Sequence, residues 1–344
     1  MCKCSRKGPW HATGIGTPVA AVSRGCGGRG REVAAMKLAV RRVTPGSGLA
    51  LDRDDGALAA LTDGLMLVEL GESAALSVPP RFAGLWCPRV GRVHASSVDG
   101  ELALTGDTVF ASDSERALEI ACAAGARCVG VLATQRTWAR LSSVATGAIA
   151  PAPTVFPALH EAPAGFGAAL TQLAAAAAQA SVLPTARIAW LAHALHDMQA
   201  PYADLIARCR GRSLVHRKQT FLRLQRVRHR IATCTDGELD VAQLARMASY
   251  SNWHLIRSFS AVFGETPYAH FMAHRIARAR GLIEKSALGI GDIAMATGFD
   301  SQSSLTRAIK RHLGVSSSEL RRRPDAAAQT AVRGEYDAAE PSPR

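Results

Sequence analysis

The sequence lacks the patterns of several large protein classes. Its eight cysteines form no C-x-x-C pair and no Cys/His spacing typical of a zinc site. No apolar run has the length and purity of a membrane-spanning helix, and no apolar secretory signal is found. Residues 36–150 contain one histidine, His94, with no H-x-H motif near it. These absences predict a cytoplasmic protein with reduced thiols, no membrane association, no cofactor and no bound metal.

The positive charge is concentrated in one part of the chain. The 344 residues carry a net charge of +13. Residues 216–323 hold 18 Lys and Arg against 8 Asp and Glu, whereas residues 36–215 hold 15 of each. A neutral domain joined to a strongly basic one is typical of a sensor attached to a DNA-binding domain, and it argues against a uniformly basic coat protein.

The basic stretch contains the same pattern twice. The first copy runs from Leu239 to Pro267 and the second from Ile290 to Ser316. The corresponding pairs are Leu244 with Ile293, Ala245 with Ala294, Leu255 with Leu305, Arg257 with Arg307, and Gly264 with Gly314. The offset is 49 residues before the turn and 50 after it. The second turn is therefore one residue longer.

Each copy predicts two short helices joined by a tight turn. In the first, Asp240 caps a short helix and Ser251 caps the next one, whose inward positions are Leu255, Phe259 and Val262. Trp253, Ile256 and Arg257 then face outward. A helix with its core face fixed and its outer N-terminal turn exposed can enter the major groove of DNA.

The second copy repeats this arrangement. Asp300 or Ser301 caps its reading helix, and the predicted inward residues are Leu305, Ile309 and Leu313. The predicted outward residues are Gln302, Ser303, Ser304 and Arg307. Gln pairs with adenine and Arg with guanine through two hydrogen bonds each. A helix over residues 267–284 would separate the copies by roughly 27 Å, against about 34 Å between successive major grooves.

The second copy and the residues after it resemble the AraC/XylS family of bacterial transcription regulators. The resemblance rests on Ile293-Ala294, Gly298-Phe299, Ser301, Arg307, Lys310-Arg311, Gly314 and Arg321, and it covers about residues 217–323. It implies double-stranded promoter DNA and RNA polymerase as partners. The candidate DNA-binding residues are Asn252, Trp253, Ile256, Arg257, Gln302, Ser303, Ser304, Arg307 and Lys310.

Four positions depart from the family pattern. Leu305 and Ile309 stand where Phe is usual, and both keep the apolar character that the core requires. Ser317 replaces the usual Pro, and a Ser can still cap the final helix. Gly289 replaces the usual Ser cap of the second motif, which predicts that this motif is the softer of the two.

Residues 36–150 show short apolar segments separated by turn signals every 8–12 residues or so, which predicts an antiparallel β-sandwich or barrel. Asp99-Gly100 is a hairpin signal. The order of elements resembles the cupin-like jelly roll found before the DNA-binding domain in many AraC-type regulators. Four residues are expected to form core or, as the alternative, to line a small-molecule pocket: Phe82, Trp86, Cys87 and Phe110.

The remaining segments are assigned from composition and periodicity. Residues 1–35 are expected to be disordered or to precede the true start at Met36, and 324–344 to be a disordered tail. Residues 151–184 are rich in Pro and Ala and predict an extended linker. Residues 185–216 predict two connector helices. Their apolar stripe of Ile188, Leu191, Leu195 and Met198 either joins subunits or packs on its own barrel.

The sequence therefore predicts an α+β multidomain protein. A cupin-like β-sandwich and a helical connector precede an all-α domain, 217–323, with two helix-turn-helix motifs. The predicted function is sequence-specific regulation of transcription, with activation and repression both open. A small-molecule effector and a homodimer are the further partners considered. The alternative is a cupin-type metal-dependent enzyme fused to a DNA-binding domain, and a third reading is an architectural DNA binder.

Overall fold

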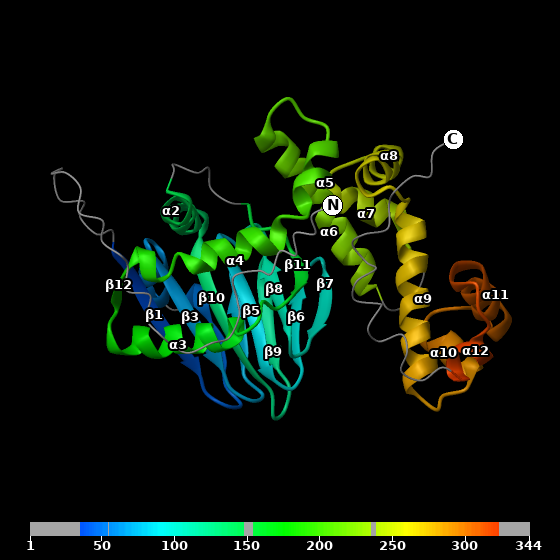
Figure 1. Ribbon diagram of the computed structural model, residues 1–344, viewed down its shortest axis with the longest axis horizontal. Coiled ribbons are helices and arrows are strands. Elements are labelled where there is room, and N and C mark those ends of the chain that lie inside the picture. The colour runs from blue at the N-terminus through cyan, green and yellow to red at the C-terminus, as the bar shows by residue number, and fades with distance from the viewer. Residues whose placement is uncertain (1–34, 54, 148–153, 235–238, 323–344) are drawn as a thin grey trace, which may run out of the picture.

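The computed structural model of the protein describes residues 35–53, 55–147, 154–234 and 239–322 (Figure 1). A domain of two β-sheets comes first, and a group of helices follows it. This agrees with the predicted order of a β-sandwich and a helical domain. The segments expected to be disordered, 1–35 and 324–344, lie outside the described residues, apart from Ala35, which begins the first strand.

The larger sheet has seven strands in the part of the chain that the structure describes. In spatial order they are β11 (Ala158–Glu161), β8 (Thr108–Ser112), β5 (Phe82–Val90), β10 (Arg127–Thr134), β3 (Gly64–Leu70), β1 (Ala35–Val43) and β12 (Val182–Pro184). The pair β1 and β3 is parallel, and the other neighbours are antiparallel. The central strands are apolar on both faces because both faces of this sheet are covered.

The smaller sheet packs against the first. Its described strands, in spatial order, are β2 (Gly48–Ala50), β4 (Ala75–Val78), β9 (Leu118–Cys122), β6 (Val93–Ser97) and β7 (Gly100–Leu104). The hairpin predicted at Asp99-Gly100 joins β6 and β7, with Ser97 opposite Gly100 and Val98-Asp99 as its loop. The turn signal in the sequence therefore marks the hairpin at one edge of the smaller sheet.

The space between the two sheets is filled by large side chains. Trp86, Phe82 and Phe110 are all at most 6% exposed and belong to this inner cluster. Trp86 lies against Gly130 on the neighbouring strand, where an added Cβ would come within 2.4 Å of the indole ring. Cys87 points to the opposite face of the sheet. These residues are therefore core, and they do not line one common pocket.

Helices cover the outer face of the larger sheet (Figure 1). The helices of the β domain are η1 (Leu51–Arg53), α1 (Asp55–Leu61), α2 (Gln135–Thr146), α3 (Phe166–Gln179), η2 (Thr185–Arg187) and α4 (Trp190–Gln199). Residues of α2, α3 and α4 share one apolar cluster with the sheet. The cluster extends the β domain well beyond residue 150.

The expected linker 151–184 is wrong for the residues that the structure describes there. This range contains β11, α3 and β12, and β12 pairs with β1. Composition misled the prediction because the two strands are short, with Pro157 just before β11 and Pro184 ending β12. Edge strands tolerate proline. The alanine-rich helix α3 packs against the sheet through its small side chains.

The apolar stripe of the connector packs on the protein's own sheet. Ile188 and Leu191 are fully buried, Leu195 is 2% exposed, and Met198 packs against the same cluster. The alternative that this stripe joins subunits is therefore wrong, because the surface is already occupied.

The remaining helices form the C-terminal part. They are α5 (Tyr202–Arg208), α6 (Leu214–Thr233), α7 (Val241–Ala248), α8 (Asn252–Phe263), α9 (Pro267–Lys285), α10 (Ile290–Ala296), α11 (Gln302–Leu313) and α12 (Ser317–Arg322). The predicted domain boundary at Arg217 falls inside α6, which begins at Leu214. None of the described helices combines the length and apolarity that crossing a bilayer needs.

Candidate nucleic-acid interface

The first helix-turn-helix pair is α7 and α8, and a capping side chain begins each helix. Asp240 and Ser251 accept hydrogen bonds from backbone N–H groups three residues ahead, at 2.9 and 3.3 Å. Ser249 turns the chain between the helices with a φ of 58°. These local contacts confirm both predicted caps, and they hold the N-terminus of α8 in place beside α7.

Helix α8 has one buried face and one open face. Its buried face consists of Leu255, Phe259 and Val262, all at most 2% exposed. On the other face Trp253 is 65% exposed and Ile256 is 40% exposed. The guanidinium of Arg257 lies over the Trp253 ring, 4.9 Å from its centroid. An exposed indole and a stacked arginine at the start of α8 form a surface suited to base edges and sugars.

The second pair, α10 and α11, repeats this geometry with a weaker start. Gly289 precedes α10 without a side-chain cap, as the sequence predicted. Of the two candidate caps for α11, Ser301 takes the role and accepts from the backbone N–H of Ser304 at 3.1 Å. Helix α12 begins with a reciprocal pair of hydrogen bonds between Ser316 and Glu319. The cap is therefore Ser316, the residue before Ser317, which stands where the family usually has proline.

The longer second turn is held by Arg275 of α9. Its Nε donates to the carbonyl oxygen of Thr297 at 2.8 Å, and its guanidinium lies 4.7 Å from the centroid of the Phe299 ring. Gly298 between them has a φ of 76°, and an added Cβ there would come within 2.4 Å of Arg275. The sequence predicted this helix only as a spacer between the two copies, so the positioning role of Arg275 was missed.

The candidate DNA-binding residues lie on the outer surfaces of α8 and α11. Eight of the nine are exposed, and Ser304 is half-buried. On α11, Arg307 donates from Nε to the carbonyl oxygen of Ser303 at 3.3 Å, which keeps it close to its own helix. Arg257 and Arg307 occupy the same place, the sixth residue, of their helices. The structure thus brings the predicted set together as two matching surfaces.

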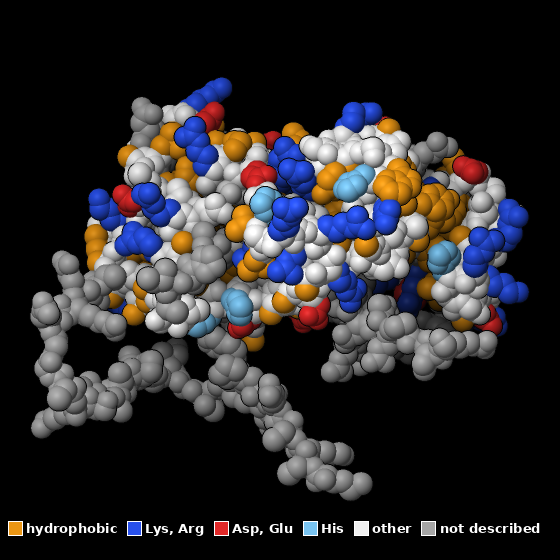
Figure 2. Space-filling model, turned by 90° about the horizontal axis from the view of Figure 1, so that it is seen from above, with side chains coloured by type: hydrophobic (Ala, Val, Ile, Leu, Met, Phe, Trp, Pro, Cys, Tyr) orange, Lys and Arg blue, Asp and Glu red, His pale blue; other side chains and the backbone are white. Residues whose placement is uncertain are grey.

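Positive side chains are prominent on this part of the molecule. Figure 2 shows Lys and Arg side chains gathered along the middle of the face seen from above, beside apolar side chains. This agrees with the excess of 10 positive charges in residues 216–323. Such a surface attracts a polyanion before any specific contact forms.

The two motifs are built on separate cores. The first shares its core with α5, α6 and Phe156 beside β11. The second has its own smaller core around Ile293, Leu305 and Ile309. Helix α9, with 19 residues, contributes to both. The first motif is therefore continuous with the β domain, whereas the second is attached through α9.

A buried ion cluster that the sequence analysis did not predict joins α6 to the β domain. Arg226 is 5% exposed and donates to Asp113 from Nη2 at 2.7 Å and from Nε at 3.1 Å. Its Nη1 lies 2.9 Å from Glu115, and its Nε lies 4.0 Å from Asp99. Arg116 adds a contact to Asp99 at 3.4 Å. The cluster fixes the orientation of α6 against the strands.

Burial affects the ionisation of this cluster. Desolvation acts to lower the pKa of Arg226, but the hydrogen bond and charge of Asp113, followed by those of Glu115, raise that pKa overall. Burial raises the pKa of Asp99, and Arg116 and Arg226 offset this only in part. Arg226 therefore remains a cation whose removal would leave three carboxyl groups close together.

Two half-buried histidines lie at the same boundary. His229 of α6 stacks on Phe110 of β8, with 5.8 Å between ring centroids, and His160 of β11 lies 5.9 Å from the Tyr202 ring of α5. Desolvation by burial lowers the pKa of each histidine to about 4. Both side chains are therefore neutral near pH 7.

Comparisons with known proteins match this helical region. A helix-turn-helix domain model covers residues 244–323. The right origin-binding protein of Escherichia coli is 36% identical over 90 residues, which is 26% of this chain and 31% of that protein. The probable transcription factor PqrA of Proteus vulgaris is 30% identical over 83 residues, 24% of this chain and 68% of PqrA. The chain belongs to the AraC family of helix-turn-helix regulators.

The family model matches the helical part of the chain. The match spans about a third of the length of the first curated relatives. The DNA-binding domain of the global transcriptional factor AdpA, solved in complex with a target DNA, is 26% identical with a TM-score of 0.28. That match covers 32% of this chain and 97% of the AdpA chain.

Proposed function

We propose that this AraC-family protein regulates transcription by binding a specific DNA site through α8 and α11. The observation that carries the proposal is the matched pair of exposed helix starts, each capped by a serine and each with an arginine at its sixth position. Helix α9 is about 28 Å long, close to the roughly 34 Å between successive major grooves. A modest bend of the DNA would bring both helices into register.

The roles of the nine residues follow from their chemistry. Arg257 and Arg307 would donate to guanine, and Asn252 and Gln302 would pair with adenine. Trp253 and Ile256 would pack against thymine methyl groups or sugars, and Ser303 and Ser304 would add hydrogen bonds. Lys310, near the end of α11, would neutralise a phosphate.

The β domain would then control the DNA-binding helices. Its charge is balanced, and Arg226 and the shared apolar core join it directly to the first motif. A small-molecule effector, a second copy of the chain and RNA polymerase are the partners that such control would involve. The metal-enzyme alternative has less support, because His94 of β6 pairs with Glu101 at 2.8 Å on a partly exposed surface.

Replacing either arginine on the reading helices should weaken site-specific binding. Binding-site selection from a random DNA library with the full-length protein supplies the site. We expect Arg257→Ala and Arg307→Ala each to cost about 1–3 kcal/mol on that duplex and to relax base preference at one position. Fluorescence anisotropy on selected and scrambled duplexes measures both effects. Arg136→Ala on α2, an exposed residue of the β domain, is the charge-matched control. Equal losses on both duplexes would rule out base reading.

Lys310→Ala should act differently. A phosphate contact is independent of sequence, so affinity should fall to a similar extent on both duplexes. The slope of log affinity against log salt should become shallower by about 0.9, the value for one phosphate. A titration from low to high KCl gives this slope. A loss restricted to the selected duplex would instead place Lys310 among the base-reading residues.

A further inference from the structure

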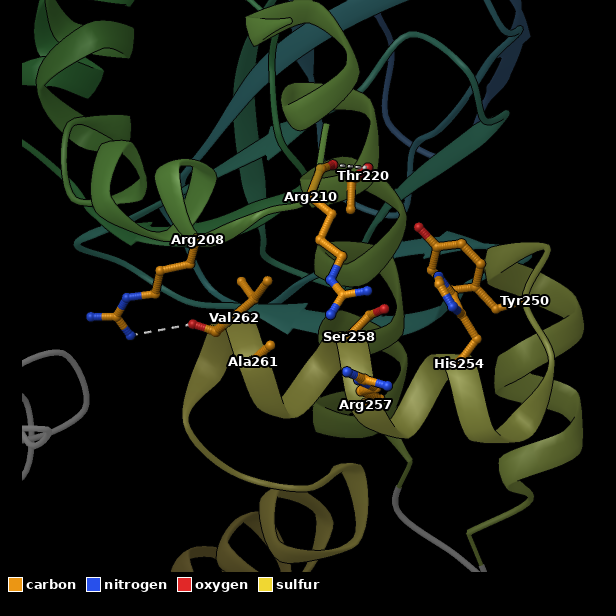
Figure 3. A pocket seen from close by; sticks show the side chains of 9 residues that line it. All are labelled: Arg208, Arg210, Thr220, Tyr250, His254, Arg257, Ser258, Ala261 and Val262. Atoms are coloured by element: carbon orange, nitrogen blue, oxygen red, sulfur yellow. Dashed lines mark hydrogen bonds between the residues drawn. The ribbon is translucent and has the colours of Figure 1, made fainter. Parts of the chain in front are cut away.

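A positively charged cavity lies beside the first reading helix and shares Arg257 with the surface of candidate DNA-binding residues. It has a volume of about 190 Å³, and its lining comes from α8 and the turn before it, from α6, and from the end of α5 and the segment after it (Figure 3). Arg208, Arg210, Arg257 and His254 line it, together with hydroxyl groups. Among the described residues, no aspartate or glutamate contributes to its lining. Three arginines therefore contribute to the lining of one cavity.

The backbone around the cavity is held by specific contacts. Thr220 of α6 donates from Oγ1 to the carbonyl oxygen of Arg210 at 3.3 Å. Arg208 donates from Nη1 to the carbonyl oxygen of Val262, near the end of α8, at 3.3 Å. In Figure 3 the Arg210 side chain extends toward Ser258 and Arg257. Arg208 thus acts as a positioning residue, and Arg210 offers its guanidinium to the cavity.

The cavity lies to the side of the DNA-reading surface. His254, Ser258 and Ala261 follow one another at helical spacing, and they are turned by about a third of a turn from Trp253. An α-helix with its side chains is roughly 10–12 Å across, which fills a major groove about 12 Å wide. The flanks of an inserted helix therefore face the sugar-phosphate backbones.

We propose that this cavity binds an oxyanion, a backbone phosphate of the bound duplex, with Arg210 as its main ligand. The proposal rests on the proposed function, because it assumes that α8 enters the groove. Guanidinium groups bind phosphate through two parallel hydrogen bonds, and Ser258 and Tyr250 provide hydroxyl donors. Arg208 and Arg210 precede residues 244–323, which the helix-turn-helix model covers. The connector would thus extend the DNA contact beyond the helix-turn-helix motifs.

The test compares full-length wild type with Arg210→Gln, which keeps hydrogen-bonding capacity and removes the charge. Anisotropy titrations use the selected duplex and a scrambled duplex across a KCl series. We expect affinity to fall roughly threefold to tenfold at low salt on both duplexes, with the salt slope shallower by about 0.9. Arg210→Lys should recover the slope but only part of the affinity. Arg136→Gln on α2 is the matched control, and melting temperatures confirm folding, since Arg210 is exposed.

Two further arms distinguish the source of the oxyanion. Inorganic phosphate is titrated against the DNA-free protein while the melting temperature is followed. In one outcome, phosphate raises the melting temperature of wild type but not that of Arg210→Gln, while the DNA salt slope is the same for both proteins. That result would assign the oxyanion site to a free anion instead of a DNA phosphate. No change in either assay beyond that of Arg136→Gln overturns the proposal. If wild type bound the selected and scrambled duplexes with equal affinity, sequence-specific recognition would be refuted. The phosphate contact of Arg210 would not be, because the salt slopes of wild type and Arg210→Gln can be compared on any duplex.

Discussion

Arg226→Ala should destabilise the full-length protein by about 3–5 kcal/mol, the range for breaking a buried ion pair by removing one partner. Arg226 is 5% exposed and donates two hydrogen bonds to Asp113. Its remaining nitrogen, Nη1, forms an ion pair with Glu115. Without Arg226, the buried Asp113 loses this cation, whereas Asp99 keeps its closer partner Arg116. The measurement is the free energy of unfolding from urea denaturation.

A control and a coupled variant make this test specific. Arg223→Ala, on an exposed position of the same helix, should change stability by less than about 0.5 kcal/mol. Adding Asp113→Asn to Arg226→Ala should cost less than the sum of the two single changes, because the second change removes a carboxylate that has lost its partner. Strictly additive losses, or a loss below about 1 kcal/mol for Arg226→Ala, would show that the cluster does not hold the domains together.

Acid should weaken the same boundary through His160 and His229. Burial lowers the pKa of each to about 4, whereas an unfolded histidine titrates near pH 6.5. Above pH 6.5 both states are neutral and stability does not depend on these groups. Below it the unfolded state binds protons first, so stability falls down to about pH 4, by roughly 1.4 kcal/mol per pH unit for each histidine.

Comparing wild type with single variants isolates this effect from other titrating groups. Between pH 7 and pH 5, the free energy of unfolding of wild type should fall by about 2 kcal/mol more than that of His229→Phe. The same difference is expected between wild type and His160→Phe. His193→Gln, at an exposed position of α4, should follow wild type. If the phenylalanine variants showed the same pH dependence as wild type, the two histidines would not be the groups that titrate.

The shared core also changes how the DNA-binding region can be isolated. Tyr202, Ile206 and Cys209 of α5 pack with Phe221 of α6 and with the core of the first motif. A fragment beginning at Arg217 would lack α5 and the first turn of α6. The binding measurements above therefore use the full chain.

The sequence alone determined the helices that we propose to read DNA, because their signals are local. The helix caps are Asp240, Ser251 and Ser301, and each accepts a hydrogen bond from the N–H group three residues ahead. The two reading helices end at Gly264 and Gly314, and the apolar spacing identifies their buried faces. Alternating apolar segments and the hairpin near Asp99 likewise predicted the two-sheet domain. Each of these features depends on residues close together in the chain.

Only the tertiary structure decided how the domains meet. Arg226 and Asp113 are 113 residues apart, and Arg226 occurs in a run of arginines on α6 that looks like an ordinary charged helix. Residues 158–161 and 182–184 become strands only because β8 and β1 offer edges for them to pair with. The stripe at Ile188 and Leu191 fits a partner subunit or its own sheet equally well by periodicity. Long-range packing determines which, because burying that apolar area against the nearby sheet needs no second chain.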